Sequence, residues 1–350
     1  MYQPMRESRH RVLRGDAADL SFLADTSVAC VVTSPPYPMI EMWDSLFRSR
    51  SPEIGRALDA GDGLRAFALM HEDLDRAWKQ IHRVLIDGGW ACINIGDATR
   101  TVNGCFRLYP NHARILSSCA QLGFDVLPAV LWRKQTNAPN KFMGSGMLPA
   151  GAYVTLEHEH ILIMRKGAKR AFASPDEKKA RRESAFFWEE RNRWFSDIWD
   201  FKGTRQDLSN SGSRERSAAF PFELPFRLIN MYSVRGDTVL DPFVGTGKTV
   251  LAAMASGRDS IGVDVDDALL RDIPVEARNA VPLLNSFLQE RLSAHERFVS
   301  EHARAKGELL HRNRHHGFPV VTGQEVDLRL ACIESVRATE DGSITVSYRD

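Results

Sequence analysis

The chain has 350 residues and a formal net charge of +1, because 46 Lys and Arg residues face 45 Asp and Glu residues. The 43% share of hydrophobic residues supports a full core and excludes a largely disordered protein, and the balanced charge confines any nucleic-acid footprint to a local patch. Five cysteines without a CxxC pair argue against a disulfide scaffold or a zinc knuckle and fit a reducing cytosol, and without a run of about 18 apolar residues we expect no membrane span.

Residues 11–165 alternate short apolar runs with helical patterns. Val28–Thr33 is a β-branched run that two prolines stop, which predicts a buried strand. The same stretch predicts two helices, at Leu64–Leu85 and Asn111–Leu122, and further strands at Trp90–Ile95, Val126–Trp132 and His160–Met164. Strands alternating with helices favour a doubly wound, mostly parallel α/β sheet.

Two stretches interrupt this rhythm. Residues 38–64, directly after the prolines, carry small Gly and Asp residues that predict mobile loops. Residues 166–216 begin within a basic run, Arg165–Arg182, and continue with three tryptophans and a Ser/Gly/Asn-rich segment. We expect an inserted, surface-facing module there.

The α/β pattern returns after residue 217. It predicts a helix, a strand, a second helix and a second strand, at Leu224–Tyr232, Thr238–Leu240, Thr249–Ser256 and Ser260–Val263. Beyond residue 281 an amphipathic helix and a hairpin around residues 340–342 form a C-terminal extension.

A glycine-rich turn, DPFVGTGKT, connects the predicted strand to the helix that follows it. Gly245 and Gly247 allow a tight turn and a close approach to a ligand, and the helix N-terminus offers free N–H groups. A Walker loop would need glycine at Pro242, and a dinucleotide fold would need it at Val250, so both are disfavoured.

A nucleoside with an amino-acid tail fits this turn better. Asp241 would meet an ammonium group, the glycines a carboxylate, and Asp264, at the end of the next strand, the ribose hydroxyls. The alternative is a turn that only packs a helix onto a strand.

A stiff corner follows the strand that ends at Thr33. Pro35 and Pro36 present carbonyl acceptors, Ser34 adds a hydroxyl oxygen, and Tyr37 adds a flat ring. Two acceptors and a stacking ring suit a planar molecule with an exocyclic NH2 group, such as cytosine or adenine. The alternative is a proline turn with a surface tyrosine.

TSPPY together with DPFVGTG resembles the paired signature of DNA amino-methyltransferases that use S-adenosylmethionine. TSPPY comes first and the glycines about 200 residues later, which is the order of the permuted β class. Three more segments resemble family motifs in register: Arg14–Ala17, Glu157–Lys166 and Ala218–Ile229. The chain departs from the family at Ser217–Ala219, where His-Pro-Ala is common, and at Lys248, where a small or hydroxyl residue is usual.

The resemblance implies a seven-stranded, Rossmann-like methyltransferase sheet with a circularly permuted motif order. Residues 1–165 plus 217–280 would form the catalytic domain, 166–216 the target-recognition region, and 281–350 the extension. S-adenosylmethionine is the implied cofactor, and no metal is expected. Asp16 would lie near its adenine, Phe220 and Phe243 on its apolar flank, and Asp264 on the ribose; Thr33, Asp241, Gly245 and Gly247 complete the implied cofactor set.

The implied activity is site-specific methylation of DNA, with the target base flipped out and stacked on Tyr37. Ser34 Oγ and the Pro35 carbonyl would accept both amine N–H groups and favour a pyramidal nitrogen that attacks the methyl group, with Pro36 stiffening the corner. In the family, serine at the first corner position goes with cytosine N4, so we expect cytosine. Adenine N6 is the alternative, as is a non-catalytic DNA-binding protein with a relict site.

A C5-cytosine enzyme would need a Pro-Cys nucleophile, which the chain lacks. The resemblance also implies duplex DNA as partner, a restriction endonuclease encoded nearby, a homodimer, and a cytoplasmic, nucleoid-associated place of action in a bacterium or archaeon.

Overall fold

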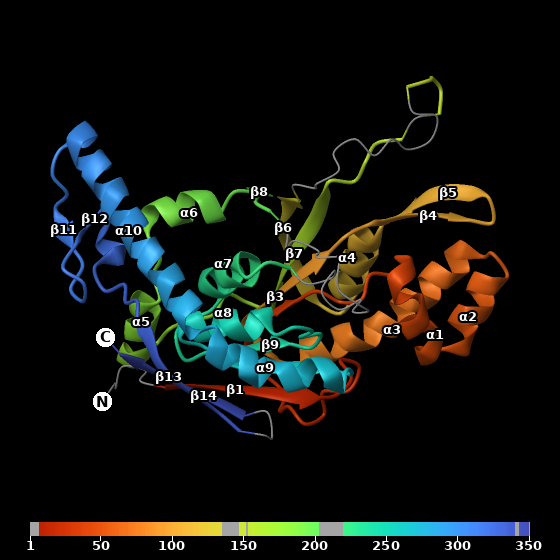
Figure 1. The fold of residues 1–350 in the computed structure, drawn as a ribbon, viewed down its shortest axis with the longest axis horizontal. Coiled ribbons are helices and arrows are strands. Elements are labelled where there is room, and N and C mark those ends of the chain that lie inside the picture. Colours follow the sequence, from red (N-terminus) through yellow and green to blue (C-terminus); the bar gives the residue numbers. More distant parts are fainter. Residues whose placement is uncertain (1–6, 135–146, 152, 203–219, 340–342, 350) are drawn as a thin grey trace.

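The computed structural model describes residues 7–134, 147–151, 153–202, 220–339 and 343–349. In this part of the chain a ten-stranded sheet forms the centre, with helices packed on both faces (Figure 1). Its strands, in spatial order, are β13 (Cys332–Ala338), β14 (Ser343–Arg349), β1 (Glu7–Arg14), β10 (Asp259–Asp264), β9 (Thr238–Asp241), β2 (Val28–Thr33), β3 (Leu85–Ile95), β7 (His158–Lys166), β6 (Phe124–Arg133) and β8 (Ile198–Asp200). The predicted doubly wound fold is confirmed.

The helices and two small hairpins complete the described architecture. The helices are α1 (Asp44–Arg50), α2 (Pro52–Asp59), α3 (Gly63–Val84), α4 (Asn111–Gln121), α5 (Pro175–Glu183), α6 (Trp188–Trp194), α7 (Glu223–Tyr232), α8 (Lys248–Ser256), α9 (Asp267–Asn279) and α10 (Val281–Lys306). The hairpins are β4 (Ala98–Val102) with β5 (Cys105–Tyr109), and β11 (His311–Arg312) with β12 (Pro319–Val320).

The seven strands from β1 to β6 form the expected methyltransferase sheet. The run β1-β10-β9-β2-β3 is parallel throughout, and β7 then lies antiparallel between β3 and β6. The sheet is wider than predicted, because β8 joins β6 and the C-terminal hairpin joins β1 through β14. The hairpin predicted near the C-terminus therefore extends the central sheet.

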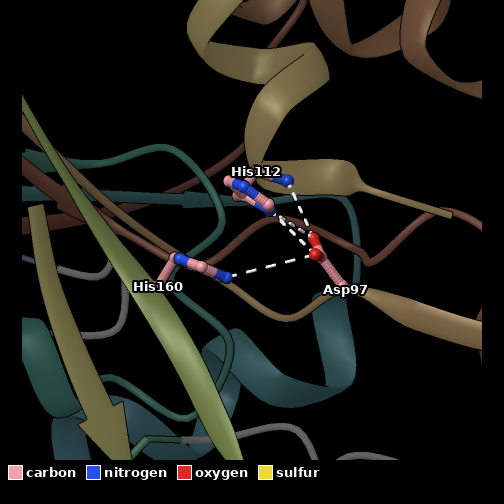
Figure 2. Close-up of side chains that lie close together, drawn as sticks. All are labelled: Asp97, His112 and His160. Atoms are coloured by element: carbon pink, nitrogen blue, oxygen red, sulfur yellow. Dashed lines mark hydrogen bonds and ion pairs between the residues drawn. The ribbon is translucent and has the colours of Figure 1, made fainter. Parts of the chain in front are cut away.

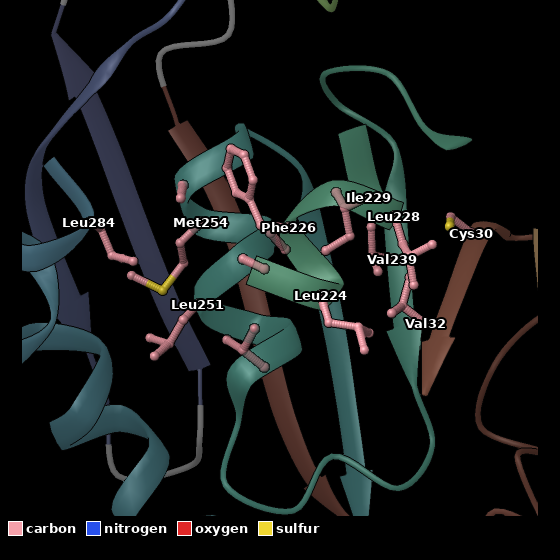
Figure 3. Packing of buried hydrophobic residues seen from close by; sticks show 14 of the residues in the cluster. Cys30, Val32, Leu224, Phe226, Leu228, Ile229, Val239, Leu251, Met254 and Leu284 are labelled. Carbon is pink, nitrogen blue, oxygen red and sulfur yellow. The ribbon is translucent and has the colours of Figure 1, made fainter. Parts of the chain in front are cut away.

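Alternating residues of β2 explain why helices cover both faces. Cys30 and Val32 belong to one buried cluster with α7 and α8, whereas Val31 belongs to a second cluster with α3. A strand buried on both faces needs an almost continuous apolar run, which is what VACVVT supplies. Figure 3 shows the first cluster, in which labelled side chains of β2, β9, α7, α8 and α10 lie together.

The topology brings the two sequence motifs to one edge. Strands β2 and β9 are parallel neighbours, with Cys30 opposite Val239 and Val31 opposite Leu240. Both strands therefore end at the same side of the sheet, where the proline corner follows β2 and the glycine turn follows β9. Crevices at this edge are the usual ligand sites of open α/β sheets.

Residues 38–64 form helices, so the prediction of mobile loops there is wrong. Ser51 caps α2 by accepting from the Glu53 N–H, and Pro52 opens that helix. Asp62 caps α3 in the same way, accepting from the Arg65 N–H. Capping residues and apolar spacing outweighed the small residues between them.

No helix of the described residues is long and apolar enough to cross a membrane.

The basic run that follows β7 lies away from the motif edge. Arg170 pairs with Asp237, which directly precedes β9, at 2.8 Å and so marks the amino ends of the strands. Arg182 pairs with Asp327 at 3.3 Å. Residues 203–216 of the expected recognition region and 217–219 of the expected catalytic domain lie outside the described residues. The recognition role of 166–216 stays a prediction.

Candidate functional site

A cavity of about 300 Å³ opens at the carboxyl ends of β2, β9 and β10. It brings the two motifs together, because Ser34 of the proline corner and Gly245 of the glycine turn both line it. The predicted site residues on its wall are Asp16, Ser34, Pro36, Phe220, Phe243, Gly245 and Asp264. The other predicted residues are not on this wall, although each is next in sequence to a residue that lines it: Thr33, Pro35, Tyr37, Asp241 and Gly247.

The two glycines of the turn do different work. Both have positive φ, +48° at Gly245 and +77° at Gly247, which favours glycine. Gly247 is the N-cap of α8. A Cβ atom there would come within 3.0 Å of the Ile273 side chain, so packing also favours glycine at this position. Gly245 faces the cavity and donates its N–H to Asp264 Oδ2 at 2.9 Å.

Asp264 ends β10 and is held in place by the backbone. Its Oδ2 accepts from Gly245, and its Oδ1 accepts from the Asp266 N–H at 3.0 Å. Burial raises the pKa of this carboxyl above its ordinary value, against the lowering effect of these hydrogen bonds. Each oxygen keeps a further lone pair that can accept a hydroxyl proton from the cavity.

Asp241 connects the ends of two strands instead of facing the cavity. It is 2% exposed, and its oxygens accept from the hydroxyls of Thr33 and Thr249, both at 2.6 Å. Burial raises the pKa of Asp241 to about 6. Because both oxygens are engaged, the predicted contact with an ammonium group stays a prediction.

The raised pKa of Asp241 predicts a specific pH dependence of stability. The folded chain keeps a proton up to about pH 6, whereas the unfolded carboxyl loses it near pH 3.8. The stabilising contribution is therefore complete below the unfolded pKa and is lost as pH rises through the folded one, by about 3 kcal/mol. We expect the free energy of unfolding of wild type, minus that of Asp241→Asn, to fall by this order between pH 4 and pH 7 in denaturant titrations. A pH-independent difference would contradict the burial effect.

Helix α1, together with Trp43 at its N-cap, supplies one cavity wall, which the sequence did not lead us to expect. Trp43, Phe47 and Arg50 line the cavity, and Arg50 pairs with Asp16 at 3.0 Å and with Asp73. Their spacing of four and three residues was the available signal, because it puts them on one helix face. These ion pairs hold α1 against the segment after β1, through Asp16, and against α3, through Asp73.

A buried hydrogen-bond network lies behind Ser34. The Tyr37 hydroxyl is 3.0 Å from Ser34 Oγ and donates to Glu159 Oε2 at 2.9 Å. Asn94 Nδ2 donates both to Tyr37 Oη, at 2.9 Å, and to Glu159 Oε2, at 2.6 Å. Lys134 forms an ion pair with the other oxygen of Glu159. Sequence reasoning assigned no role to Asn94, Glu159 or Lys134, although a polar Asn94 within the apolar end of β3 was a usable signal.

The side chains of Asp97, His112 and His160 lie close together, and all three are residue types that can ligate a metal ion (Figure 2). Asp97 accepts from the His112 backbone N–H at 3.1 Å and lies 2.8 Å from His112 Nδ1. The rings of His112 and His160 are stacked 3.9 Å apart at 14°. Imidazole lone pairs lie in the ring plane, so two nearly parallel rings cannot both direct a nitrogen at one ion. Asp97 therefore holds His112, at the start of α4, beside His160 of β7.

Comparison with known proteins places this arrangement in a family. The model of the DNA methylase family, which covers N6 and N4 amino-methyltransferases, matches residues 28–274. The chain belongs to the DNA methylase family. Its motif order and sheet are those of the β class of DNA amino-methyltransferases, so the resemblance noted in the sequence is confirmed.

Two curated relatives resemble this DNA methylase over most of its length. Type II methyltransferase M.MthZI of Methanothermobacter thermautotrophicus is 46% identical over 346 residues, which cover 98% of this chain and 96% of the relative. Type II methyltransferase M.MjaI of Methanocaldococcus jannaschii is 48% identical over 273 residues, which cover 75% of this chain and 89% of the relative.

Two solved structures of DNA methyltransferases also resemble this chain. A provisionally assigned DNA modification methylase from Thermus thermophilus, in complex with S-adenosyl-L-methionine, has a TM-score of 0.61 and 31% identity, covering 78% of this chain and 96% of its own. PvuII DNA methyltransferase, described as cytosine-N4-specific, has a TM-score of 0.52 and 16% identity, covering 77% and 86%, and shares the fold.

The cavity of this DNA methylase fits the cofactor of its family, S-adenosylmethionine. Several kinds of contact that such a cofactor needs line this one cavity. They are the acid at the end of β10, the glycine turn, and the aromatic side chains of Phe220 and Phe243. Ser34 and Pro36 lie on the same cavity, so a bound methyl donor and a target base would share one space.

Proposed function

We propose that this DNA methylase transfers a methyl group from S-adenosylmethionine to N4 of a cytosine flipped out of duplex DNA. The observation that carries the proposal is the shared cavity of Ser34 and Gly245, which puts an acceptor for an exocyclic amine beside a nucleoside-type pocket. Serine at the first corner position supports cytosine over adenine, by resemblance to the family.

The corner acts by positioning. An exocyclic amine is a poor nucleophile because its lone pair is delocalised into the ring. Ser34 Oγ and the Pro35 carbonyl would accept its two N–H groups and draw the nitrogen toward a pyramidal, more nucleophilic form. Pro36 keeps this corner stiff, and the ring of Tyr37 would offset part of the cost of flipping the base.

The cofactor would supply an activated methyl group when bound. Asp264 would accept from the ribose hydroxyls, and Phe220 and Phe243 would exclude water from one flank. Asp16, fixed by Arg50, would face the adenine. Positioning and dehydration of the two reactants would account for most of the rate enhancement.

The wider setting follows from the substrate. Duplex DNA would contact the motif edge, with residues 166–216 as the proposed recognition region. The Type II methyltransferase names of M.MthZI and M.MjaI support a restriction-modification role with a cognate endonuclease. A homodimer and action on the nucleoid of a bacterial or archaeal cytoplasm are parts of the same proposal.

Mass spectrometry of nucleosides tests the base directly. Duplex DNA of mixed sequence, incubated with the purified protein and labelled S-adenosylmethionine, should yield N4-methylcytosine. N6-methyladenine alone would refute the choice of cytosine and establish the adenine alternative. Absence of cofactor binding by calorimetry, together with no methylation of any base, would favour a non-catalytic DNA-binding protein with a relict site.

A further inference from the structure

The network behind Ser34 has a fixed direction. Glu159 is a carboxylate and can only accept, so Tyr37 donates its single hydroxyl proton to it. Tyr37 Oη already accepts from Asn94 Nδ2. The contact of 3.0 Å between Ser34 Oγ and Tyr37 Oη must therefore be a donation from Ser34 to Tyr37.

This direction has a consequence for the cavity. The Ser34 proton is directed inward to Tyr37, so the lone pairs of Ser34 Oγ remain for a group in the cavity that Ser34 lines. Ser34 is thereby an acceptor and not a donor. Without a carboxylate at Glu159, Tyr37 could donate to Ser34 instead, and Ser34 would then present its own proton to the cavity.

We propose that Glu159 is a positioning residue that sets Ser34 as the acceptor for the target amine and receives, through Tyr37, the proton that the amine loses. The inference deepens the proposed function and rests on it, although it holds for cytosine or adenine. The path runs from Ser34 Oγ to Tyr37 Oη to Glu159 Oε2, with hydrogen bonds of 3.0 and 2.9 Å.

The reaction requires such an acceptor. Methyl transfer forms a nitrogen–carbon bond with the amine lone pair and breaks the sulfur–carbon bond, whose electrons stay on sulfur. The amine nitrogen then carries a positive charge and must lose one proton. That proton passes to Ser34 Oγ while the Ser34 proton moves to Tyr37 and the Tyr37 proton to Glu159, so both hydroxyls stay neutral and Glu159 becomes a carboxylic acid.

The environment of Glu159 suits this task. The residue is 9% exposed, so the path is shielded from bulk water, yet its second oxygen meets Lys134, which is more than one-third exposed. Burial and the Glu159 charge raise the pKa of Tyr37 well above its usual range, which keeps Tyr37 a proton donor. Among the described residues, the other titratable groups around this carboxylate are His158 and His160 on its own strand, with Asp97 and His112 beyond His160.

The test compares Glu159→Gln with Glu157→Gln in single-turnover methylation of duplex DNA. Glu157 lies two residues earlier, has a 43% exposed side chain and pairs with Arg133, so it is a matched control outside the network. We expect Glu159→Gln to lower the rate of the chemical step roughly 10²-fold, as for loss of a proton acceptor, with cofactor and DNA dissociation constants unchanged. Glu157→Gln should retain the wild-type rate.

A pH profile distinguishes this role from a structural one. A path that ends on a carboxylate gives the wild-type single-turnover rate a fall on the acid side, and this limb should be missing in Glu159→Gln, which has no carboxyl group there. Tyr37→Phe should cause a similar loss, and the double variant Tyr37→Phe/Glu159→Gln should be no slower than either single variant, because all three lack the same path. If Glu159→Gln does not fold, Tyr37→Phe supplies the same comparison.

The outcomes separate the inference from the proposed function. A wild-type protein that methylates no base would overturn both. An active wild type whose Glu159→Gln variant keeps its rate and its acid limb, or additive losses in the double variant, would overturn the role of Glu159 alone. A wild type that methylates adenine would change the base and leave this test intact.

Discussion

Replacing Tyr37 by alanine should lower the single-turnover rate of methyl transfer roughly 10³-fold and leave cofactor affinity nearly unchanged. The variant loses both the hydroxyl that joins Ser34 to Glu159 and the ring proposed to stack on the flipped base. Tyr37 is not on the wall of the 300 Å³ cavity, so S-adenosylmethionine should bind as before. Rapid-quench methylation assays give the rate, and calorimetry gives the affinity.

The Tyr37→Phe variant separates the contribution of the hydroxyl group from that of the ring. It keeps the ring and loses only the hydroxyl, so we expect it to fall roughly 10²-fold, with the remaining factor of about ten belonging to the ring. A thermal melt of both variants checks that the fold is intact, because the ring fills the space beside Gly96, where a Cβ atom would come within 3.0 Å of it. A Tyr37→Ala variant that turns over like wild type would show that the corner is not the catalytic site.

Replacing Asp264 by alanine should weaken S-adenosylmethionine binding roughly 10³-fold, since two charge-assisted hydrogen bonds to a ribose would be lost at about 1.5–3 kcal/mol each. The side chain also holds the Gly245 N–H at 2.9 Å, so the glycine turn loses an anchor. At saturating cofactor the chemical step should recover much of its rate, because the proline corner is unchanged.

Two further variants serve as a milder substitution and as a control for Asp264→Ala. Asp264→Asn keeps an acceptor for Gly245 and should weaken binding less, whereas Asp267→Asn, at an exposed ion pair with Arg271, should leave it unchanged. Calorimetric titration with S-adenosylmethionine measures all three. Wild-type affinity in Asp264→Ala would place the ribose elsewhere and remove Asp264 from the proposed cofactor site.

The amino-acid sequence alone determined the fold class and the motif order of this DNA methylase. β-branched runs and helical spacing are local signals, so the strand predicted at Val28–Thr33 and the helix predicted at Leu64–Leu85 match β2 and α3 closely. The motifs TSPPY and DPFVGTG can likewise be identified from residue type alone, because prolines and glycines restrict or widen the backbone conformation and acids carry a specific chemistry.

Only the tertiary structure decided which side chains meet. Thr33 and Asp241 are 208 residues apart and share a hydrogen bond because β2 and β9 are parallel neighbours, which no local pattern specifies. The same is true of Tyr37 and Glu159, 122 residues apart, whose contact fixes the direction of the Ser34 hydroxyl. Hydrogen bonds between distant segments depend on strand order and register, and these are set by burial across the whole sheet instead of by neighbours in the chain.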